Sequence, residues 1–534
     1  MNKHFQTHRP EVMGSDWMVT ADHPLAARAG ATVLESGGNA VDAAVAANLV
    51  LSVVRPHMCG FGGDLFALVY LDGPGQLRAL NASGRAPGQA GIEAFQSRGL
   101  DRIPESGVLT GTVPGAVSGW QELLSNYGTM SLDRLLPEAI HYAENGFPVY
   151  EELRQAIAFR QPLLERQEAA AGIYCPKGRL PAAGELLVQP QLAKSYRVLA
   201  AEGPDGFYQG ELGLALVKAS REQGGLFSPE DLAGHRADWV EPLSTDYRGL
   251  QICTQPPNSQ GLALLMQANL LEHFEAAGLG PDRAELIHLM VEAKKLSFAD
   301  RDRYVCDPAF HDIPLGELLD KDLARRRAGG IDPGQAAENV SPGRFTKGGQ
   351  DTVYLAVVDG QGNSVSLIQS IYEPFGSCFM VPETGMFLHN RGRGFSLDPD
   401  HPNRLEPGKR PFHTLHPAMV LRDGQPLIVL GSPGADGQTQ TVIQLIAALI
   451  DFQARPQEAV EAPRWRSEAD GSLLLEGRFP KAAIQTLSSL GHRVTVLDDY
   501  DGVMGSSQVI AIDRERGVLS AGADPRRQAY AIGR

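Results

Sequence analysis

The chain has 534 residues, long enough for one large α/β core, and its 43% hydrophobic and 21% charged residues are typical of a globular protein. Its formal net charge of −15, without a basic stripe, argues against nucleic-acid partners and against an anionic membrane surface. The five cysteines are odd in number, widely spaced and never in a C-x-x-C pair, which excludes a disulfide framework and a cysteine zinc site. Residues 1–19 contain no apolar signal segment, so a cytoplasmic protein is expected.

The first part of the chain predicts two helices, a glycine loop and a strand. Residues 24–54 have helical spacing, and Gly37-Gly38-Asn39 ends one helix and begins the next. The apolar run 40–54 is short and carries two polar residues, which indicates a buried helix and not a membrane span. The glycine cluster 60–64 precedes the strand 65–70. It lacks the strand-before, helix-after setting of a dinucleotide fingerprint, so close backbone approach is favoured over phosphate binding.

Residues 115–345 are predicted to be mostly helical. Ser228-Pro229-Glu230-Asp231 has the residues of a helix N-terminus, and apolar residues in 284–304 recur at helical spacing. Within that segment, His288 is interpreted as a core or surface histidine in preference to a metal ligand. After residue 352 the pattern changes to strands joined by hairpins, followed by a helix near 439–450. This order favours sheets stacked between helical layers.

Thr352 occupies the first position of a strand that is apolar on both faces, and Asp351 precedes it. A threonine within a chain is a poor nucleophile. Cleavage of the 351–352 bond would free its α-amine, which could then act as the base beside its own hydroxyl. The loop 360–362 pairs Thr352 with Ser370 across a hairpin, which would bring the two Cβ atoms to about 4.5–5.5 Å. A two-residue loop would instead pair Thr352 with Gln369.

A second candidate feature is the turn 431–435, which ends the strand 427–430 just before the last long helix. Backbone N–H groups in such a turn are suited to hold an oxyanion. The alternative is an ordinary connection between a strand and a helix.

Ordered motifs run along nearly the whole chain. They include Gly37-Gly38-Asn39-Ala40-Val41-Asp42, Gly60-Phe61-Gly62-Gly63-Asp64, Val113-Pro114-Gly115-Ala116, Pro256-Pro257-Asn258-Ser259-Gln260-Gly261, Asp351-Thr352, Pro407-Gly408-Lys409-Arg410-Pro411 and Gly431-Ser432-Pro433-Gly434. Together these motifs resemble those of the γ-glutamyltransferase family of N-terminal-nucleophile hydrolases.

The resemblance implies an α/β (α+β) fold with four layers, αββα, made as a proenzyme that cuts itself through an N→O acyl shift. Fragments 1–351 and 352–534 would remain together as one catalytic domain, a heterodimer, with a dimer of these heterodimers left open. Thr352 would be the nucleophile and its α-amine the base, Ser370 the hydroxyl partner, and the N–H groups of Gly434 and Ala435 the oxyanion hole. No metal or organic cofactor is implied.

The substrate-binding motifs depart from the family pattern at three places. Ser83 stands where the family has an arginine for the substrate carboxylate, and Arg85, two residues on, could face the same side of a strand. His413-Thr414 replaces a pair of serines. Tyr372 completes this part of the predicted substrate-binding set.

At the third place, Gly394 stands where the family has an acid for the substrate's α-amine, with Arg391 and Arg393 beside it. Loss of the acid removes a partner for an ammonium group, and the arginines add partners for a carboxylate or carbonyl. The alternative is that both arginines pair with structural acids.

Three functions follow, each with a small-molecule amide as the substrate or ligand. The resemblance favours γ-glutamyl transfer or hydrolysis with glutathione-like donors. Close behind is hydrolysis of another acyl amide that carries a carboxylate, as in the divergent branch with cephalosporin-type acylases and amidohydrolases of oxamate. The third is an unprocessed, catalytically silent binding homologue, because Thr352-Val353-Tyr354 replaces the family's usual Thr-Thr-His.

Overall fold

The computed structural model describes residues 7–338 and 351–534, apart from the side chains of Ala277 and Asp351. The expectations for residues 1–6 and for a helix over 339–345 lie outside the described residues.

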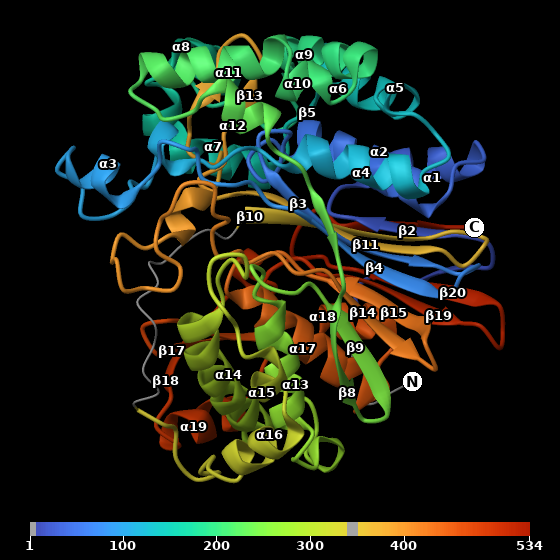
Figure 1. Cartoon of the computed structure of the whole chain (residues 1–534). Helices are drawn as coiled ribbons and strands as arrows, with labels where there is room; N and C mark the ends of the chain where they lie inside the picture. Colours follow the sequence, from blue (N-terminus) through green and yellow to red (C-terminus); the bar gives the residue numbers. More distant parts are fainter. Residues whose placement is uncertain (1–6, 339–350) are drawn as a thin grey trace.

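Two seven-stranded antiparallel sheets are stacked face to face between two layers of helices (Figure 1). The upper sheet has the order β21 (Tyr530–Gly533), β2 (Met18–Ala21), β10 (Asp351–Val358), β11 (Ser364–Tyr372), β3 (Asp64–Leu71), β4 (Gln76–Ala82) and β7 (Asp238–Val240). The lower sheet has the order β1 (Val12–Gly14), β20 (Val518–Ala523), β19 (Gln508–Asp513), β15 (Gln425–Gly431), β14 (Ala418–Arg422), β9 (Leu250–Thr254) and β8 (Leu243–Tyr247).

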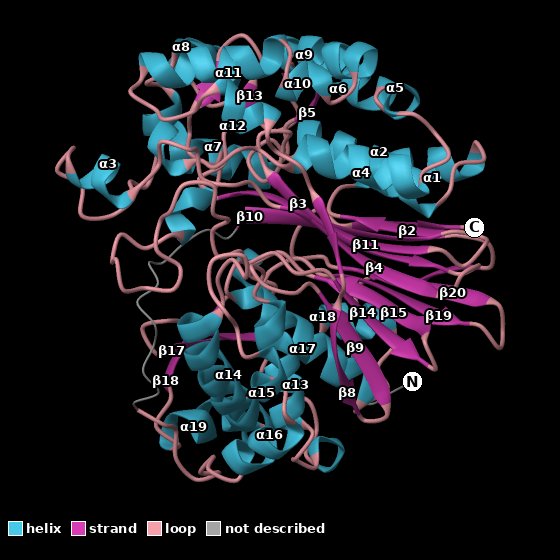
Figure 2. Cartoon of the chain, viewed as in Figure 1, coloured by secondary structure: helices cyan, strands magenta, loops and turns pink. Residues whose placement is uncertain are grey.

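Helices cover the outer face of each sheet, as the cyan layers in Figure 2 show. Above the upper sheet lie α1 (Pro24–Glu35), α2 (Ala40–Val54), α4 (Ala116–Tyr127), α5 (Leu132–Leu135), α6 (Pro137–Asn145), α7 (Glu151–Leu164), α8 (Glu168–Tyr174), α9 (Pro190–Glu202), α10 (Asp205–Tyr208), α11 (Glu211–Glu222) and α12 (Pro229–Ala233), with α3 (Ile92–Gln96) to one side. Below the lower sheet lie α13 (Gly261–Leu271), α14 (Ala284–Tyr304), α15 (Leu315–Leu318), α16 (Lys321–Ala328), α17 (Gly437–Ile450), α18 (Pro456–Glu461) and α19 (Lys481–Ser489). The predicted αββα layering is confirmed.

Small sheets complete the chain. They are β5 (Phe147–Pro148) with β6 (Leu186–Leu187), β12 (Met380–Val381) with β13 (Met386–Phe387), and β16 (Trp465–Ser467) with β17 (Ser472–Glu476) and β18 (Arg493–Leu497).

The N-terminal helix pair forms as predicted. The Asn39 side chain accepts hydrogen bonds from the first turn of α2 while Asp42 accepts one from the Asn39 N–H, a reciprocal cap. All of α2 is buried, because it is apolar around its whole circumference and lies between the upper sheet and other helices. Among the described residues, no helix combines the length and the apolarity needed to cross a bilayer.

The central strand β10 is buried on both faces, which explains its continuous apolar run. Val353, Leu355 and Val357 contact the upper helices, whereas Tyr354, Ala356 and Val358 lie in the core between the two sheets. Side chains alternate along a strand, so Thr352 belongs to the face between the sheets.

Candidate active site

Thr352 and Ser370 lie together at the end of the β10–β11 hairpin. The strands pair Val353 with Gln369, and the Thr352 Oγ1 donates a hydrogen bond to the Ser370 Oγ over 3.2 Å. This is the register that the three-residue loop predicts. A bulge follows at once, because Asp351 pairs with Tyr372. The cut at the 351–352 bond stays a prediction, and the Asp351 side chain lies outside the described residues.

The next strand adds an acid to this row. Ser370 of β11 faces Asp64 of β3, so Thr352, Ser370 and Asp64 share the face between the sheets. Gly63 allows the approach: a Cβ on it would lie 2.5 Å from the Ser370 carbonyl oxygen. The close backbone contact predicted for this glycine loop is therefore confirmed.

Asp64 has no role in the sequence prediction, although it ends the glycine motif used there. Its side chain is buried, accepts a hydrogen bond from the Gly84 N–H over 2.9 Å, and lies 3.2 Å from His413 Nε2. Burial raises the pKa of Asp64 to about 7, an effect that the nearby Arg391 opposes. An acid at the first position of an otherwise apolar strand is the sequence feature that could have identified it.

His413 is a neutral hydrogen-bond donor to this acid. Its Nδ1 accepts the Leu415 N–H over 3.2 Å, which leaves the proton on Nε2, toward Asp64. Burial and the charge of Arg391 hold the pKa of His413 well below its ordinary value. His413 therefore orients Asp64 without adding a charge to the site.

Arg391 provides a buried cation beside this row. Its guanidinium lies 4.0 Å from the centre of the Tyr372 ring, and the N–H of Tyr372 donates to the Ser370 Oγ over 2.7 Å. Arg391 Nη1 donates to the Thr414 Oγ1 over 3.1 Å, whereas Nη2 has no hydrogen-bond partner among the described residues. Burial lowers the pKa of Arg391 to about 10, so it stays charged at neutral pH.

The neighbouring Arg393 is already paired. Its guanidinium forms an ion pair with Glu373, which also binds Arg160 over 2.7 Å. Each of the two interpretations therefore applies to one arginine. Arg393 pairs with a structural acid, whereas Arg391 lacks a comparable ion pair among the described residues and can serve a substrate group.

The segment around Ser83 is held by other protein groups. The Ser83 Oγ donates to the Asn81 Oδ1 over 2.7 Å. Arg85 forms ion pairs with Asp238 and Asp307 and is about one-third exposed. These contacts fix the segment but do not bring Arg85 to Thr352.

The turn after β15 approaches the same end of the space between the sheets. Gly431 faces the Tyr354 ring, and Gly434 and Ala435 follow with φ of 134° and 48°. Gln260 Nε2 donates to the Ala435 carbonyl over 2.9 Å. Within the described part of the chain, the N–H groups of Gly434 and Ala435 donate to no protein acceptor. A positive φ at a non-glycine residue costs free energy and is retained where the surroundings enforce it.

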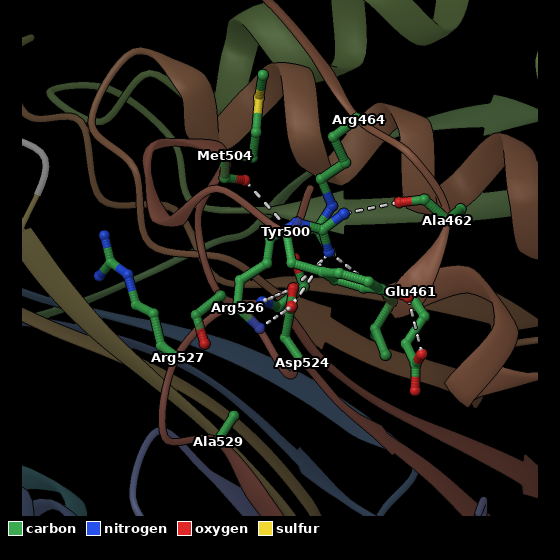
Figure 3. A network of polar contacts seen from close by, with 12 residues as sticks. Glu461, Ala462, Arg464, Tyr500, Met504, Asp524, Arg526, Arg527 and Ala529 are labelled. Carbon is green, nitrogen blue, oxygen red and sulfur yellow. Dashed lines mark hydrogen bonds and ion pairs between the residues drawn. The ribbon is translucent and has the colours of Figure 1, made fainter. Parts of the chain in front are cut away.

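A buried network of charged side chains that includes Arg464 and Asp524 contacts Met504 (Figure 3). Arg464 pairs with Asp524 over 2.7 Å and donates to the Met504 carbonyl over 3.2 Å. Gly505 then packs on the turn, because a Cβ on it would lie 2.5 Å from the Pro433 carbonyl oxygen. The network therefore fixes the position of the two free N–H groups.

Comparison with known proteins identifies the family. The family described as Gamma-glutamyltranspeptidase matches residues 26–534. The chain is 42% identical to the Glutathione hydrolase-like YwrD proenzyme of Bacillus subtilis, covering 98% of this chain and 99% of that protein. It is 38% identical to the Oxamate amidohydrolase proenzyme of Klebsiella pneumoniae, covering 97% and 98%. The crystal structure of cephalosporin acylase from Bacillus halodurans superimposes with a TM-score of 0.93 at 38% identity, covering 99% and 98%.

Proposed function

This chain belongs to the gamma-glutamyltranspeptidase family and is an N-terminal-nucleophile hydrolase of that family. We propose that it is a self-processing amidohydrolase, and that the acyl group of its substrate ends in a carboxylate. The observation that carries the substrate class is the buried Arg391, which stacks on Tyr372 next to Ser370 and has a donor nitrogen without a hydrogen-bond partner among the described residues.

Maturation begins at the 351–352 bond. The Thr352 Oγ1 attacks the Asp351 carbonyl carbon, and the acyl group moves from nitrogen to oxygen, which gives an ester. Water cleaves the ester, leaving a carboxylate on Asp351 and a free α-amine on Thr352. An unperturbed α-amine has a pKa of about 7.7–8.0, which suits a base at neutral pH.

Turnover uses the same hydroxyl. The α-amine takes the proton of the Thr352 hydroxyl as Oγ1 attacks the carbonyl carbon of the substrate amide. Ser370, which is hydrogen-bonded to Oγ1, holds the hydroxyl in place. The N–H groups of Gly434 and Ala435 are assigned to the oxyanion, where one such donor contributes about 10²–10³-fold in rate. The leaving amine takes the proton from the α-ammonium, and water then hydrolyses the acyl ester.

Acyl recognition is assigned to Arg391 with Tyr372 and Thr414. The guanidinium is fixed by the Tyr372 ring and by the Thr414 hydroxyl, so Nη2 is pre-oriented to donate to a carboxylate. Buried charged groups in proteins are normally paired, and a substrate carboxylate would supply the missing partner. Ser83, Arg85 and Arg393 are not assigned to the substrate, because protein groups already engage them.

A second candidate is γ-glutamyl hydrolysis or transfer, the activity named in the glutathione hydrolase-like relative. It requires an acid for the substrate's α-ammonium. Asp64 is the observation that favours it, since this carboxyl lies in the Thr352 row and has a pKa of about 7. An ammonium next to Asp64 would favour its ionised form.

Two measurements test the proposal. A denaturing gel of purified protein should show bands of about 38 and 20 kDa, in proportion to fragment lengths in a 57.4 kDa chain, and Thr352→Ala should leave one full-length band. The processed enzyme is then given glutaryl, γ-glutamyl and butyryl p-nitroanilides. We expect the highest kcat/KM with the glutaryl compound.

Preference for the γ-glutamyl anilide would support the second candidate in place of the first. A single band that matches the Thr352→Ala variant, with no turnover, would establish the catalytically silent homologue.

A further inference from the structure

A compact group of metal-ligating side chains lies in the lower helical layer, apart from the Thr352 site. His288 and Glu292 lie one turn apart on α14, and His492 comes from the segment just before β18. All three are buried, and one donor atom from each lies within 4.8 Å of the others. His288 Nδ1 is 2.8 Å from His492 Nε2.

The hydrogen bonds orient His288 as a metal ligand. Its Nε2 lies 2.8 Å from the Asp332 carbonyl oxygen, which can only accept, so the ring proton belongs on Nε2. The lone pair of Nδ1 therefore points toward His492 and Glu292. A backbone carbonyl on the outer nitrogen is the usual second contact of a metal-bound histidine.

His492 supplies the second imidazole. Since His288 Nδ1 carries the lone pair, the His492 Nε2–H donates to it over 2.8 Å, and this proton would move to His492 Nδ1 when an ion binds. Two zinc-bound nitrogens at 2.0–2.1 Å would be roughly 3.4 Å apart in a tetrahedron. The two rings would therefore separate by roughly half an ångström when an ion enters between them.

Glu292 keeps coordinating capacity despite two existing contacts. Lys295 Nζ donates to Oε1 over 2.7 Å, and the Ala337 N–H donates to Oε2 over 3.2 Å. A carboxylate has about four lone-pair sites, so these two donors leave room for a cation. The Lys295 charge opposes cation binding and sets a limit to the affinity.

An entry route is present. His492 and Lys295 line a cavity of about 400 Å³, which also extends to Asp436 and Ser467. Water can therefore reach the cluster and fill the fourth position of a tetrahedral ion.

We propose that His288, Glu292 and His492 form a zinc-binding site. Two imidazoles and one carboxylate, with water as the fourth ligand, match the ligand preferences of Zn²⁺. His288 and Glu292 lie in fragment 1–351 and His492 in fragment 352–534, so in the processed enzyme the ion joins the two fragments. It also holds residues 332–337, because the Asp332 carbonyl oxygen contacts His288 and the Ala337 N–H donates to Glu292.

The test uses the processed full-length protein, stripped with a chelator and titrated with ZnCl₂ by calorimetry. We expect one Zn²⁺ per chain, and at least a tenfold weaker Kd in His288→Gln and in His492→Gln. His311→Gln, which removes an exposed histidine, is the matched control and should leave the Kd unchanged. Co²⁺ in the same site should give the visible absorption of a tetrahedral ion.

Lys295→Met provides an independent test, because it removes no ligand. Loss of the opposing charge should tighten Zn²⁺ binding several-fold. Absence of stoichiometric binding to the stripped wild-type protein would overturn the proposal. Binding that both ligand variants leave unchanged would overturn it as well.

Discussion

Replacement of Arg391 by methionine should abolish the preference for a carboxylate-bearing acyl group while leaving the fold intact. Methionine keeps an unbranched apolar stem over the Tyr372 ring but has no charge. In the folded protein, burial lowers the pKa of Arg391 from 12.5 to about 10, which corresponds to roughly 3 kcal/mol of unfavourable charge burial. A bound carboxylate would offset this free energy.

The expected loss of activity follows from the hydrogen bond between Arg391 and the substrate carboxylate. One charge-assisted hydrogen bond contributes about 1.5–3 kcal/mol, so kcat/KM for the glutaryl anilide should fall about 100-fold. For the butyryl anilide, which has no carboxylate, kcat/KM should change less than about threefold. The thermal midpoint should stay the same or rise, because a buried charge that forms no ion pair within the described part of the chain is removed.

The assay is steady-state hydrolysis of both anilides by fully processed protein, with fragment content checked on a gel. Arg85→Met is the control, because that guanidinium is partly exposed and paired with Asp238 and Asp307. An equal loss on both substrates would refute the assignment of Arg391 to the acyl carboxylate. So would an equal loss in the control variant.

Three further predictions concern groups around the nucleophile. Gly505→Ala should lower kcat about 100-fold, because the added Cβ displaces the Pro433 carbonyl and the N–H groups that follow it. The control is Gly75→Ala, which has a similar positive φ and no neighbour within 4 Å, and should only reduce stability. Stopped activity assays and thermal melts of both variants separate the two effects. The pKa of Asp64 is raised from 3.8 to about 7, so its contribution to folding stability is lost as pH rises through this range. The stability gained by Asp64→Asn, measured by urea unfolding, should therefore be larger at pH 8 than at pH 5. A gain that does not grow with pH would contradict this. Ser370→Ala removes the acceptor of the Thr352 hydroxyl and should slow both self-cleavage and turnover at least tenfold, measured by band conversion over time; unchanged rates would remove Ser370 from the mechanism.

The layers and the hairpin were predictable because local rules determine them. Asn39 caps a helix, the Asp423-Gly424 turn takes φ of 51° and 77° as a tight hairpin requires, and the loop length fixes Ser370 opposite Thr352. Each of these depends on residues close together in the sequence.

The pairing of the charged groups was not predictable in the same way. Arg391 and Arg393 are two residues apart, yet one stacks on Tyr372 and the other meets Glu373. That difference depends on the direction of each side chain in a short 3-10 helix against distant strands. His288 likewise reads as an isolated histidine until the fold brings His492, 204 residues later, within 2.8 Å.

The order of strands in the upper sheet has a consequence for the life of the mature enzyme. Strand β2 of fragment 1–351 lies between β21 and β10 of fragment 352–534, and β11 of the small fragment pairs with β3 of the large one, so strands of both fragments are interleaved in one sheet. Cleavage at 351–352 would remove the connection that guided this arrangement during folding while leaving every strand in place. The cut protein would then persist through its slow unfolding and not through reversible folding, so heat inactivation should be irreversible and fragments of two differently tagged enzymes should not exchange.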